Sequence, residues 1–140
     1  MKVFAITLSI CIAAGIALSL FIRLRPVTVA DVPALPGAEP PGDYELAGGY
    51  YAVRPVEAVD VRTLLHRISV TERTQRLSET QEKLPAVFVH RTEFFGFPDL
   101  TQVWAENGNL YVYGHLVYGY SDLDSNRERI QLWLSSSERR

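Results

Sequence analysis

The sequence of 140 residues contains a single cysteine, Cys11. One cysteine cannot form an intramolecular disulfide, and it excludes a zinc site built from several cysteines. The three histidines are far apart and lack the short spacing of metal-ligating pairs: His66, His90 and His115. We therefore expect no metal site, and no residue pattern in the chain indicates a cofactor.

Basic residues are scarce outside the N-terminal segment. The whole chain has a net charge of −2, from 14 Lys and Arg against 16 Asp and Glu. Removing residues 1–25 takes away Lys2, Arg23 and Arg25, which leaves 11 basic against 16 acidic side chains and a charge of −5. No run of Lys and Arg appears in that remainder. This charge balance argues against a nucleic-acid partner.

An uncharged apolar run occupies residues 3–22 and is followed by Arg23. Twenty helical residues span about 30 Å, the thickness of the hydrocarbon core of a bilayer. A cleavable signal peptide is the alternative, but its apolar region is usually about 7–15 residues long and is followed by small residues. This run instead ends in Phe21 and Ile22. We predict a transmembrane anchor over residues 1–25 that contacts membrane lipid through residues 3–22.

Cys11 lies inside this run, where Leu8-Ser9-Ile10-Cys11 weakly matches a bacterial lipoprotein box. Isoleucine stands where that box has glycine or alanine, so a thiol packed among lipids or side chains is favoured. The flanking charges do not decide the orientation, because Lys2 and the α-amino group balance Arg23 and Arg25. Since the rest of the chain has no cytoplasmic motif, we place the soluble domain outside the cytoplasm, on the periplasmic side of the cell membrane.

Residues 26–42 contain five of the eight prolines and few large apolar side chains. Such a segment cannot continue a helix or join the middle of a sheet. We therefore predict an extended, semi-rigid linker that holds the domain away from the membrane. From Asp43 the composition becomes that of a folded unit, and a small α+β domain is predicted over residues 43–137.

The first half of this domain is expected to contain strands and one helix. Tyr50–Val53 is a β-prone run after two glycines, and Ala86–Phe95 is a second. Between them, Pro55 is expected to begin a helix at a position where its missing N–H does no harm. Apolar residues recur at helical spacing over residues 56–68: Val61, Leu64, Leu65 and Ile68. The polar residues 71–77 are expected to form an edge strand or a loop.

The second half begins with a strong hairpin signal. Leu100–Ala105 and Leu110–Tyr118 are rich in β-branched and aromatic residues, and they flank Asn107-Gly108. Asn-Gly between two such runs predicts a tight β-hairpin turn. Two overlapping capping boxes, which start at Ser121 and Ser125, then predict the beginning of a final helix. The polar tail after that helix is expected to fray.

This order of elements predicts an α+β fold: an antiparallel β-sheet with two helices packed on one face, preceded by one N-terminal transmembrane helix. Ile130, Trp133 and Leu134 mark the buried face of the final helix. The other face of the sheet is then free of helices.

Aromatic side chains are concentrated within 27 residues: Phe94, Phe95, Phe97, Trp104, Tyr111, Tyr113, Tyr118 and Tyr120. Because side chains alternate along a strand, Tyr111, Tyr113 and His115 share one sheet face. We expect an open aromatic face that binds an apolar small molecule or an envelope protein, with core or surface packing as the alternative. The candidate binding residues are Tyr111, Tyr113, His115 and Trp104.

Two short motifs near the final helix resemble functional sites but are incomplete. Gly119-Tyr120-Ser121-Asp122-Leu123 matches half of a nucleophile elbow, with leucine in place of the second glycine. A small hydrolase or transferase that uses Ser121 with a nearby His and Asp is therefore the alternative function. Asp122–Asn126 matches the first five positions of a calcium loop, but Arg127 replaces the required glycine and Trp133 the required glutamate. We assign no catalytic residue and no metal ligand.

Two groups of residues carry a family resemblance. Gly96, Phe97 and Asp99 precede the hairpin, and a second group opens the final helix: Gly119, Ser121, Asp122, Leu123, Asn126 and Arg129. Together they resemble the domain-of-unknown-function 1499 family, which is common in bacteria and often membrane-anchored. This chain departs from the family pattern at Asp124, where the family has glycine. The resemblance implies an architecture and an extracytoplasmic setting but no activity.

The second motif group also leads to a structural expectation. We expect Asp99 and the polar groups of residues 122–126 to lock the turn before the final helix by hydrogen bonds. The protein is then expected to be a membrane-anchored interaction or ligand-binding module.

Overall fold

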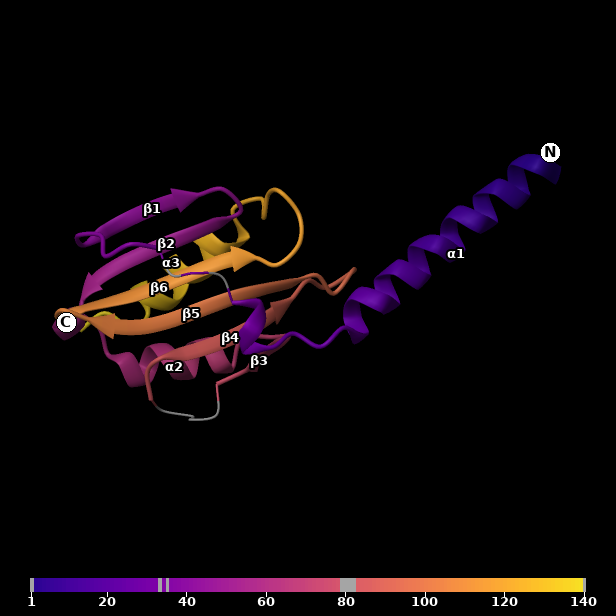
Figure 1. The fold of residues 1–140 in the computed structure, drawn as a ribbon. Helices are drawn as coiled ribbons and strands as arrows, with labels where there is room; N and C mark the ends of the chain where they lie inside the picture. The colour runs from indigo at the N-terminus through magenta and orange to yellow at the C-terminus, as the bar shows by residue number, and fades with distance from the viewer. Residues whose placement is uncertain (1, 33, 35, 79–82, 140) are drawn as a thin grey trace.

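The computed structural model describes residues 2–32, 34, 36–78 and 83–139. Its helices and strands are α1 (Lys2–Leu24), β1 (Gly42–Leu46), β2 (Gly49–Pro55), α2 (Val61–Ser69), β3 (Thr74–Arg76), β4 (Ala86–Arg91), β5 (Pro98–Glu106), β6 (Asn109–Leu116) and α3 (Ser125–Ser135). The strands form one antiparallel sheet in the order β1-β2-β6-β5-β4-β3, and α1 projects from one end of it (Figure 1). This arrangement confirms the predicted α+β fold.

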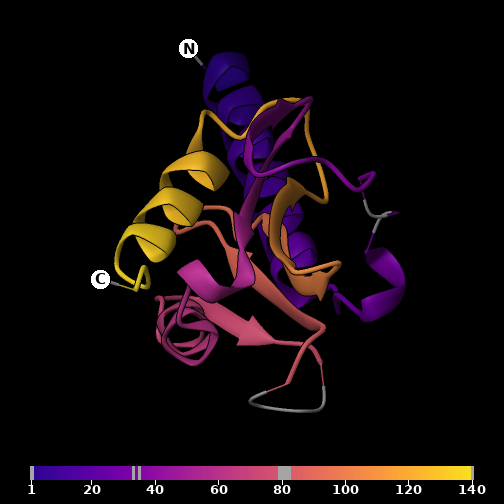
Figure 2. The same cartoon turned by 90° about the vertical axis from the view of Figure 1, so that its left-hand side faces the viewer.

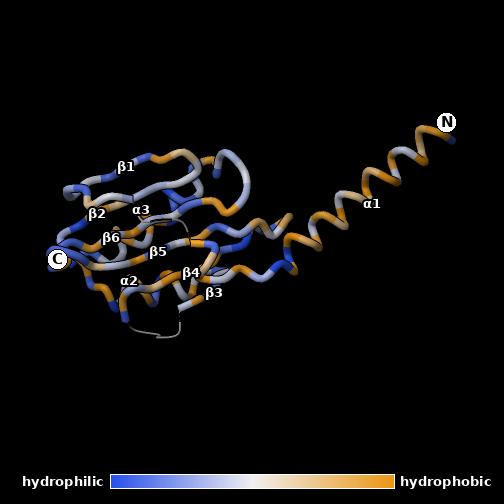
Figure 3. The backbone as a smooth tube through the Cα atoms, viewed as in Figure 1, coloured by the Kyte–Doolittle hydropathy of each residue, from blue (hydrophilic) through white to orange (hydrophobic). Residues whose placement is uncertain are grey.

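Helix α1 is the most apolar element of the chain (Figure 3). Its 23 residues are long and apolar enough to cross a membrane, a property that signal sequences near an N-terminus share. Its C-terminal end adjoins the domain, where Ile22 is buried.

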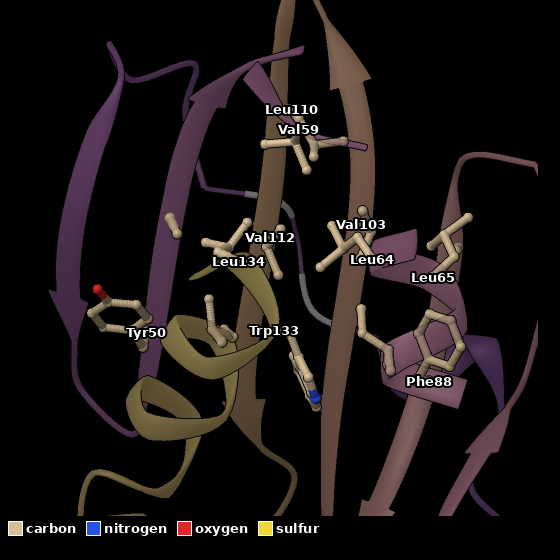
Figure 4. Close-up of a cluster of buried hydrophobic side chains, with 14 residues drawn as sticks. Tyr50, Val59, Leu64, Leu65, Phe88, Val103, Leu110, Val112, Trp133 and Leu134 are labelled. Atoms are coloured by element: carbon tan, nitrogen blue, oxygen red, sulfur yellow. The ribbon is translucent and has the colours of Figure 1, made fainter. Parts of the chain in front are cut away.

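Helices α2 and α3 pack on the same face of the sheet, as predicted (Figure 2). Their apolar stripes meet the inward side chains of four strands in one continuous core, which Figure 4 shows. Fully burying a side chain such as Leu64 or Phe88 contributes about 1.5–3 kcal/mol, so this core supplies much of the stability of the domain. The expected stripe on α2 is confirmed, with Leu64, Leu65 and Ile68 buried.

Helix α2 begins later than predicted. Pro55 ends strand β2, and Val56–Ala58 forms a short 3-10 turn rather than α-helix. The α-helix starts at Val61, because the Asp60 carboxylate accepts hydrogen bonds from the backbone N–H groups of Arg62 and Thr63. The side-chain cap of Asp60, and not Pro55, therefore sets the first residue of α2.

The predicted hairpin is confirmed in β5 and β6, which pair from Asp99↔Leu116 to Glu106↔Asn109. Its turn has positive φ at Asn107 (49°) and Gly108 (78°), the conformation that Asn-Gly favours. Strand β4 ends at Arg91 rather than at Phe95, because the amide of Gly96 donates to the carbonyl of Thr92 and closes a turn. Residues 74–76 form an edge strand within the polar segment.

Strand β1 was not predicted, because its polar residues hide the alternation. It pairs with β2 and places Tyr44 opposite Tyr51.

The capping boxes predicted for α3 are wrong. Ser125 is the first residue of the helix, and the Ser121 hydroxyl accepts a hydrogen bond from the amide of Leu123 instead. The helix N-terminus is capped by Asp122, whose Oδ2 accepts from the amide of Asn126 at 3.0 Å. Leu123 and Asp124 have φ of 50° and 64°, so the chain enters the helix through two left-handed residues.

The C-terminal tail does not fray as expected. The amide of Asp60 donates to the carbonyl of Ser137, and the amide of Arg139 donates to the carbonyl of Ala58. Val59 and Glu138 form an antiparallel bridge between these bonds. The tail is therefore paired with the segment that precedes α2.

The proline-rich linker is not a spacer. Val27 and Val32 pack on the helix-free face of the sheet, against Val87, Val89 and Leu100. Farther along, the Tyr51 hydroxyl donates to the carbonyl of Gly37 at 3.1 Å. Valines among the prolines give the linker enough apolar surface to lie along the sheet instead of extending away from it.

Candidate functional site

The motif residues of β5 and α3 converge beneath the first turn of α3. Nη2 of Arg129 donates to Oδ2 of Asp99 at 2.6 Å and to Oδ1 of Asn126 at 2.8 Å. Asp99 and Asn126 are buried, while the Arg129 side chain is 24% exposed. The three side chains join the start of β5 to α3, which agrees with the expected hydrogen-bonded lock.

Three polar atoms of this cluster are buried without a hydrogen-bond partner in the described part of the chain: Asp99 Oδ1, Asn126 Nδ2 and Arg129 Nε. Burial raises the pKa of the Asp99 carboxyl, and the Arg129 guanidinium offsets only part of that rise. The two short hydrogen bonds of Arg129 Nη2 therefore stabilise the cluster, and its three unpaired buried atoms destabilise it.

Gly114 on β6 makes room for this cluster. A Cβ atom at that position would lie 2.7 Å from Asn126 Oδ1 and 3.0 Å from Ile130 Cδ1. The glycine therefore lets the first turn of α3 approach the sheet closely. The motif glycines Gly96 and Gly119 have positive φ and lie in turns at the ends of strands.

Ser121 and Asp122 line a small polar hollow of about 150 Å³ beside Gly48 and Gly49. The hydroxyl of Ser121 has one hydrogen bond among the described residues, from the amide of Leu123 at 3.3 Å. His90, on β4, is held between two threonine hydroxyls, Thr74 and Thr101. No histidine lines the hollow within the described ranges, so the geometry gives serine catalysis no support.

Among the residues that the structure describes, no group of three His, Cys, Asp or Glu side chains is arranged to hold a metal ion.

The four predicted binding residues share the helix-free face of the sheet. Trp104 stacks on Tyr111 with ring centroids 5.0 Å apart, and Tyr113 lies 4.8 Å from His115. The face is not open, however. Trp104, Tyr111 and His115 are buried, and Tyr113 is half-buried. Tyr44 of β1 packs against the ring cluster, and the linker lies along the same face. Binding through the three tyrosine and tryptophan rings stays a prediction that requires these covers to move.

A cavity of about 360 Å³ lies on this face, where the linker crosses the end of β6. Its lining combines the last residue of the anchor segment and one linker residue with a four-residue stretch: Arg25, Asp31, His115, Leu116, Val117 and Tyr118. Of the predicted binding residues, only His115 lines it.

His115 provides a defined polar group at this cavity. Its Nδ1 lies 3.1 Å from the carbonyl oxygen of Leu116, so Nδ1 carries the proton and donates. Burial lowers the pKa of the ring, which keeps it neutral and leaves a lone pair on Nε2. Nε2 is buried and has no partner among the described residues. His115 therefore holds an unused hydrogen-bond acceptor that is shielded from solvent.

Arg25, at the end of the anchor segment, and Asp31 of the linker supply the charged part of the lining. The guanidinium of Arg25 lies 5.3 Å from the ring centre of Tyr118, a cation–π distance. The carboxylate of Asp31 is already engaged, because it accepts from the amide and hydroxyl of Thr28. Sequence reasoning missed Arg25 and Asp31 because it assigned Arg25 to the anchor and treated the linker as a spacer. Val27 and Val32 pack on the domain, but they form no periodic pattern from which this contact could have been predicted.

Residues 38–136 match the profile of a family described as a protein of unknown function, DUF1499. Searches of curated proteins and of solved structures returned no match. The family match contains both motif groups and every element from β1 to α3. It covers well over half of the chain, and the protein therefore belongs to the DUF1499 family.

Proposed function

We propose that this protein is a single-pass, membrane-anchored binding module with its domain outside the cytoplasm. Its ligand is a small apolar molecule that carries a hydroxyl or N–H donor, and its site is the cavity between the linker and β6. The observation that carries this proposal is the buried, unpartnered Nε2 of a neutral His115 in the cavity lining. An unsatisfied buried polar atom costs about 1–3 kcal/mol, and a ligand donor that displaces the groups shielding Nε2 would remove that cost.

The size and lining of the cavity support a small molecule. Ligand pockets usually measure about 300–1,000 Å³, with apolar walls and few polar groups. Here Leu116, Val117 and Tyr118 supply apolar surface, His115 supplies the acceptor, and Arg25 and Asp31 supply charged groups at one side. A small molecule is favoured over an envelope protein because the aromatic rings of this face are buried.

The position of the cavity suggests where the ligand comes from. Arg25 lines the cavity and directly follows Leu24, the last residue of α1. If α1 spans the bilayer, the cavity lies at the membrane surface, where apolar molecules concentrate. An alcohol or amine dissolved in the lipid could then enter without crossing water.

Photolabelling tests this proposal. The full chain in phosphatidylcholine nanodiscs is irradiated with a long-chain alcohol that carries a diazirine, and the labelled peptides are mapped by mass spectrometry. We expect adducts on residues 115–118 in addition to those on α1. Adducts restricted to α1 would show partition into lipid only and would refute the cavity site.

A matched pair of variants tests the acceptor. His115→Phe keeps a ring but removes Nε2, so labelling of residues 116–118 is expected to fall about fivefold, the equivalent of one hydrogen bond. His66→Phe is the control, because His66 is exposed on α2. Equal labelling in both variants would contradict a role for His115.

A reporter fused after Arg140 tests the sidedness. Activity of a reporter that works only in the cytoplasm would refute the extracytoplasmic placement.

A further inference from the structure

We propose that the end of the domain nearest α1 inserts into the bilayer through the turn between β4 and β5, with Phe94 and Phe95 among the acyl chains beside α1. This inference rests on the anchoring part of the proposed function. It assigns the domain a second lipid contact, separate from α1, that fixes how the domain stands on the membrane.

The turn exposes two adjacent large aromatic side chains. Phe94 is 81% exposed and Phe95 is 58% exposed. Phe95 contacts Phe97 with ring centroids 5.9 Å apart, which extends the apolar surface. Contiguous exposed apolar surface of this kind marks a contact with a partner or a membrane.

The turn is fixed to the end of α1. Nη2 of Arg23 donates to the carbonyls of Glu93 and Phe94, both at 2.6 Å. In return, Nη1 of Arg91 donates to the carbonyl of Ile22 at 3.2 Å and to that of Gly96 at 3.0 Å. These bonds set the turn at the same height as the C-terminal end of α1.

Phe94 and Phe95 lie beside α1 across an apolar groove, so they share the environment of that helix. The two phenylalanines line a groove of about 530 Å³ whose other wall is one side of α1: Ile12, Gly15, Ile16, Ser19, Leu20 and Arg23. At 1.5 Å per residue, Leu20 and Ile16 lie about 3 and 9 Å inward from Ile22, the end of the apolar run. Interfacial segments bury their apolar face about 5–10 Å deep. The rings therefore reach the acyl chains if α1 spans the membrane.

A second loop at the same end of the sheet carries exposed apolar residues. Tyr120 and Leu123, between β6 and α3, are almost fully exposed. Because Asp99 at the start of β5 pairs with Leu116 at the end of β6, this loop leaves the sheet on the side of α1 (Figure 1). Tyrosine and other amphipathic side chains are enriched at the membrane–water interface. Exposed apolar side chains in two loops thus favour lipid as the partner of this end.

Site-specific quenching tests the inference on the full chain. An environment-sensitive fluorophore is attached to Phe94→Cys in a Cys11→Ser background, in phosphatidylcholine nanodiscs with or without brominated acyl chains. We expect about a twofold or larger loss of fluorescence with brominated lipid, as for a residue buried at acyl-chain depth. Leu132→Cys is the matched control, because Leu132 is apolar and 68% exposed on α3, and it is expected to show no loss.

A label on the native Cys11 separates this inference from the proposed anchoring. Quenching at Cys11 without quenching at Phe94→Cys would overturn the inserted turn and leave the anchor standing. No quenching at Cys11 would overturn the anchor itself. Phe95→Cys provides a second site in the same turn, so that a local disturbance at position 94 does not decide the result.

Discussion

The two faces of the sheet are covered in different ways. On one face, α2 and α3 form a single continuous core with the strands. On the other, a proline-rich linker and the edge strand β1 cover two separate apolar clusters. Regular helices exclude water over a whole face, whereas a linker that follows an irregular path leaves the cavity beside His115. The helix face therefore provides the larger apolar core, and the linker face contains the cavity that we propose as the ligand site.

The largest loss of stability is expected when a large side chain of the helix-side core is truncated. Phe88→Ala removes a fully buried ring from the helix-side core and is expected to lower the free energy of unfolding by about 3–5 kcal/mol. Urea unfolding of the full chain in detergent micelles, followed by circular dichroism, measures the loss. Leu132→Ala, on the exposed side of α3, is the control and should change stability by less than about 0.5 kcal/mol.

The second-largest loss of stability is expected from breaking the hydrogen-bonded cluster of Asp99, Asn126 and Arg129. Asp99→Ala leaves Arg129 without its carboxylate and is expected to cost about 2–4 kcal/mol, less than a fully buried pair because Arg129 is partly exposed. Breaking the more exposed pair with Asp43→Ala, which removes the partner of Arg54, should cost less than about 1 kcal/mol. Equal losses in the two variants would show that the lock does not hold α3 to the sheet.

Acid should destabilise the helix face through His90. Burial lowers the pKa of His90 to about 3, whereas an unfolded chain titrates near 6.5. The stabilisation from the neutral ring is present above pH 6.5 and is lost as the pH falls toward 3, with a slope of at most about 1.4 kcal/mol per pH unit.

Urea midpoints between pH 7 and pH 4 measure this slope. The variant His90→Gln is expected to flatten it, and His66→Gln, on the exposed side of α2, to leave it unchanged. His115 on the linker face contributes in the same direction, because burial lowers its pKa too.

A smaller effect is expected where the linker meets the sheet. Val32→Asp places a charge on the half-buried position that packs against the Val87 cluster and is expected to cost about 1–2 kcal/mol. It should also increase quenching of Trp104 fluorescence by acrylamide, because that ring lies on the same face. Val29→Asp is the control, since Val29 is exposed in the same segment. If both variants quench alike, the linker does not cover the face in solution.

The smallest effect is expected in the loop that carries the chain from the sheet to α3. Asp124 has φ of 64°, a conformation that costs a non-glycine residue about 1–2 kcal/mol and aspartate somewhat less. Asp124→Gly is therefore expected to raise the unfolding free energy by about 0.5–1 kcal/mol. Ser125→Gly, one residue later inside the helix, should lower it by a similar amount. A loss in the first variant would mean that the Asp124 carboxylate matters more than its backbone.

Strong local sequence patterns were sufficient to predict the helix-covered face of the sheet. The Asn-Gly turn set the β5–β6 register, and the alternation of Leu110 to Leu116 placed side chains on the correct faces. The apolar spacing of α2 was also sufficient, although its first residue depended on the Asp60 cap. The motif residues Asp99, Asn126 and Arg129 were identified from the sequence, and their contact across 30 positions required the fold.

The linker face could not be predicted in the same way. Proline forbids regular structure but does not prevent a chain from packing, and Val27 and Val32 have no periodicity that would reveal their contacts. The short polar strand β1 was missed for a similar reason. From the sequence, Phe94 and Phe95 were assigned to a strand, because the hydrogen bonds that turn the chain before them join Thr92 to Gly96 and Phe97 and leave no local sequence pattern.

The order of the strands has a consequence for association between copies. The edges of the sheet are β1 and β3, which have five and three residues, while the longest strands, β5 and β6, lie inside. An exposed strand edge is a template for pairing with another chain. Short edge strands with charged residues such as Asp43 and Arg76 offer few backbone groups for such pairing. If α1 confines many copies to one plane, this arrangement disfavours edge-to-edge aggregation at the high local concentrations of a membrane surface.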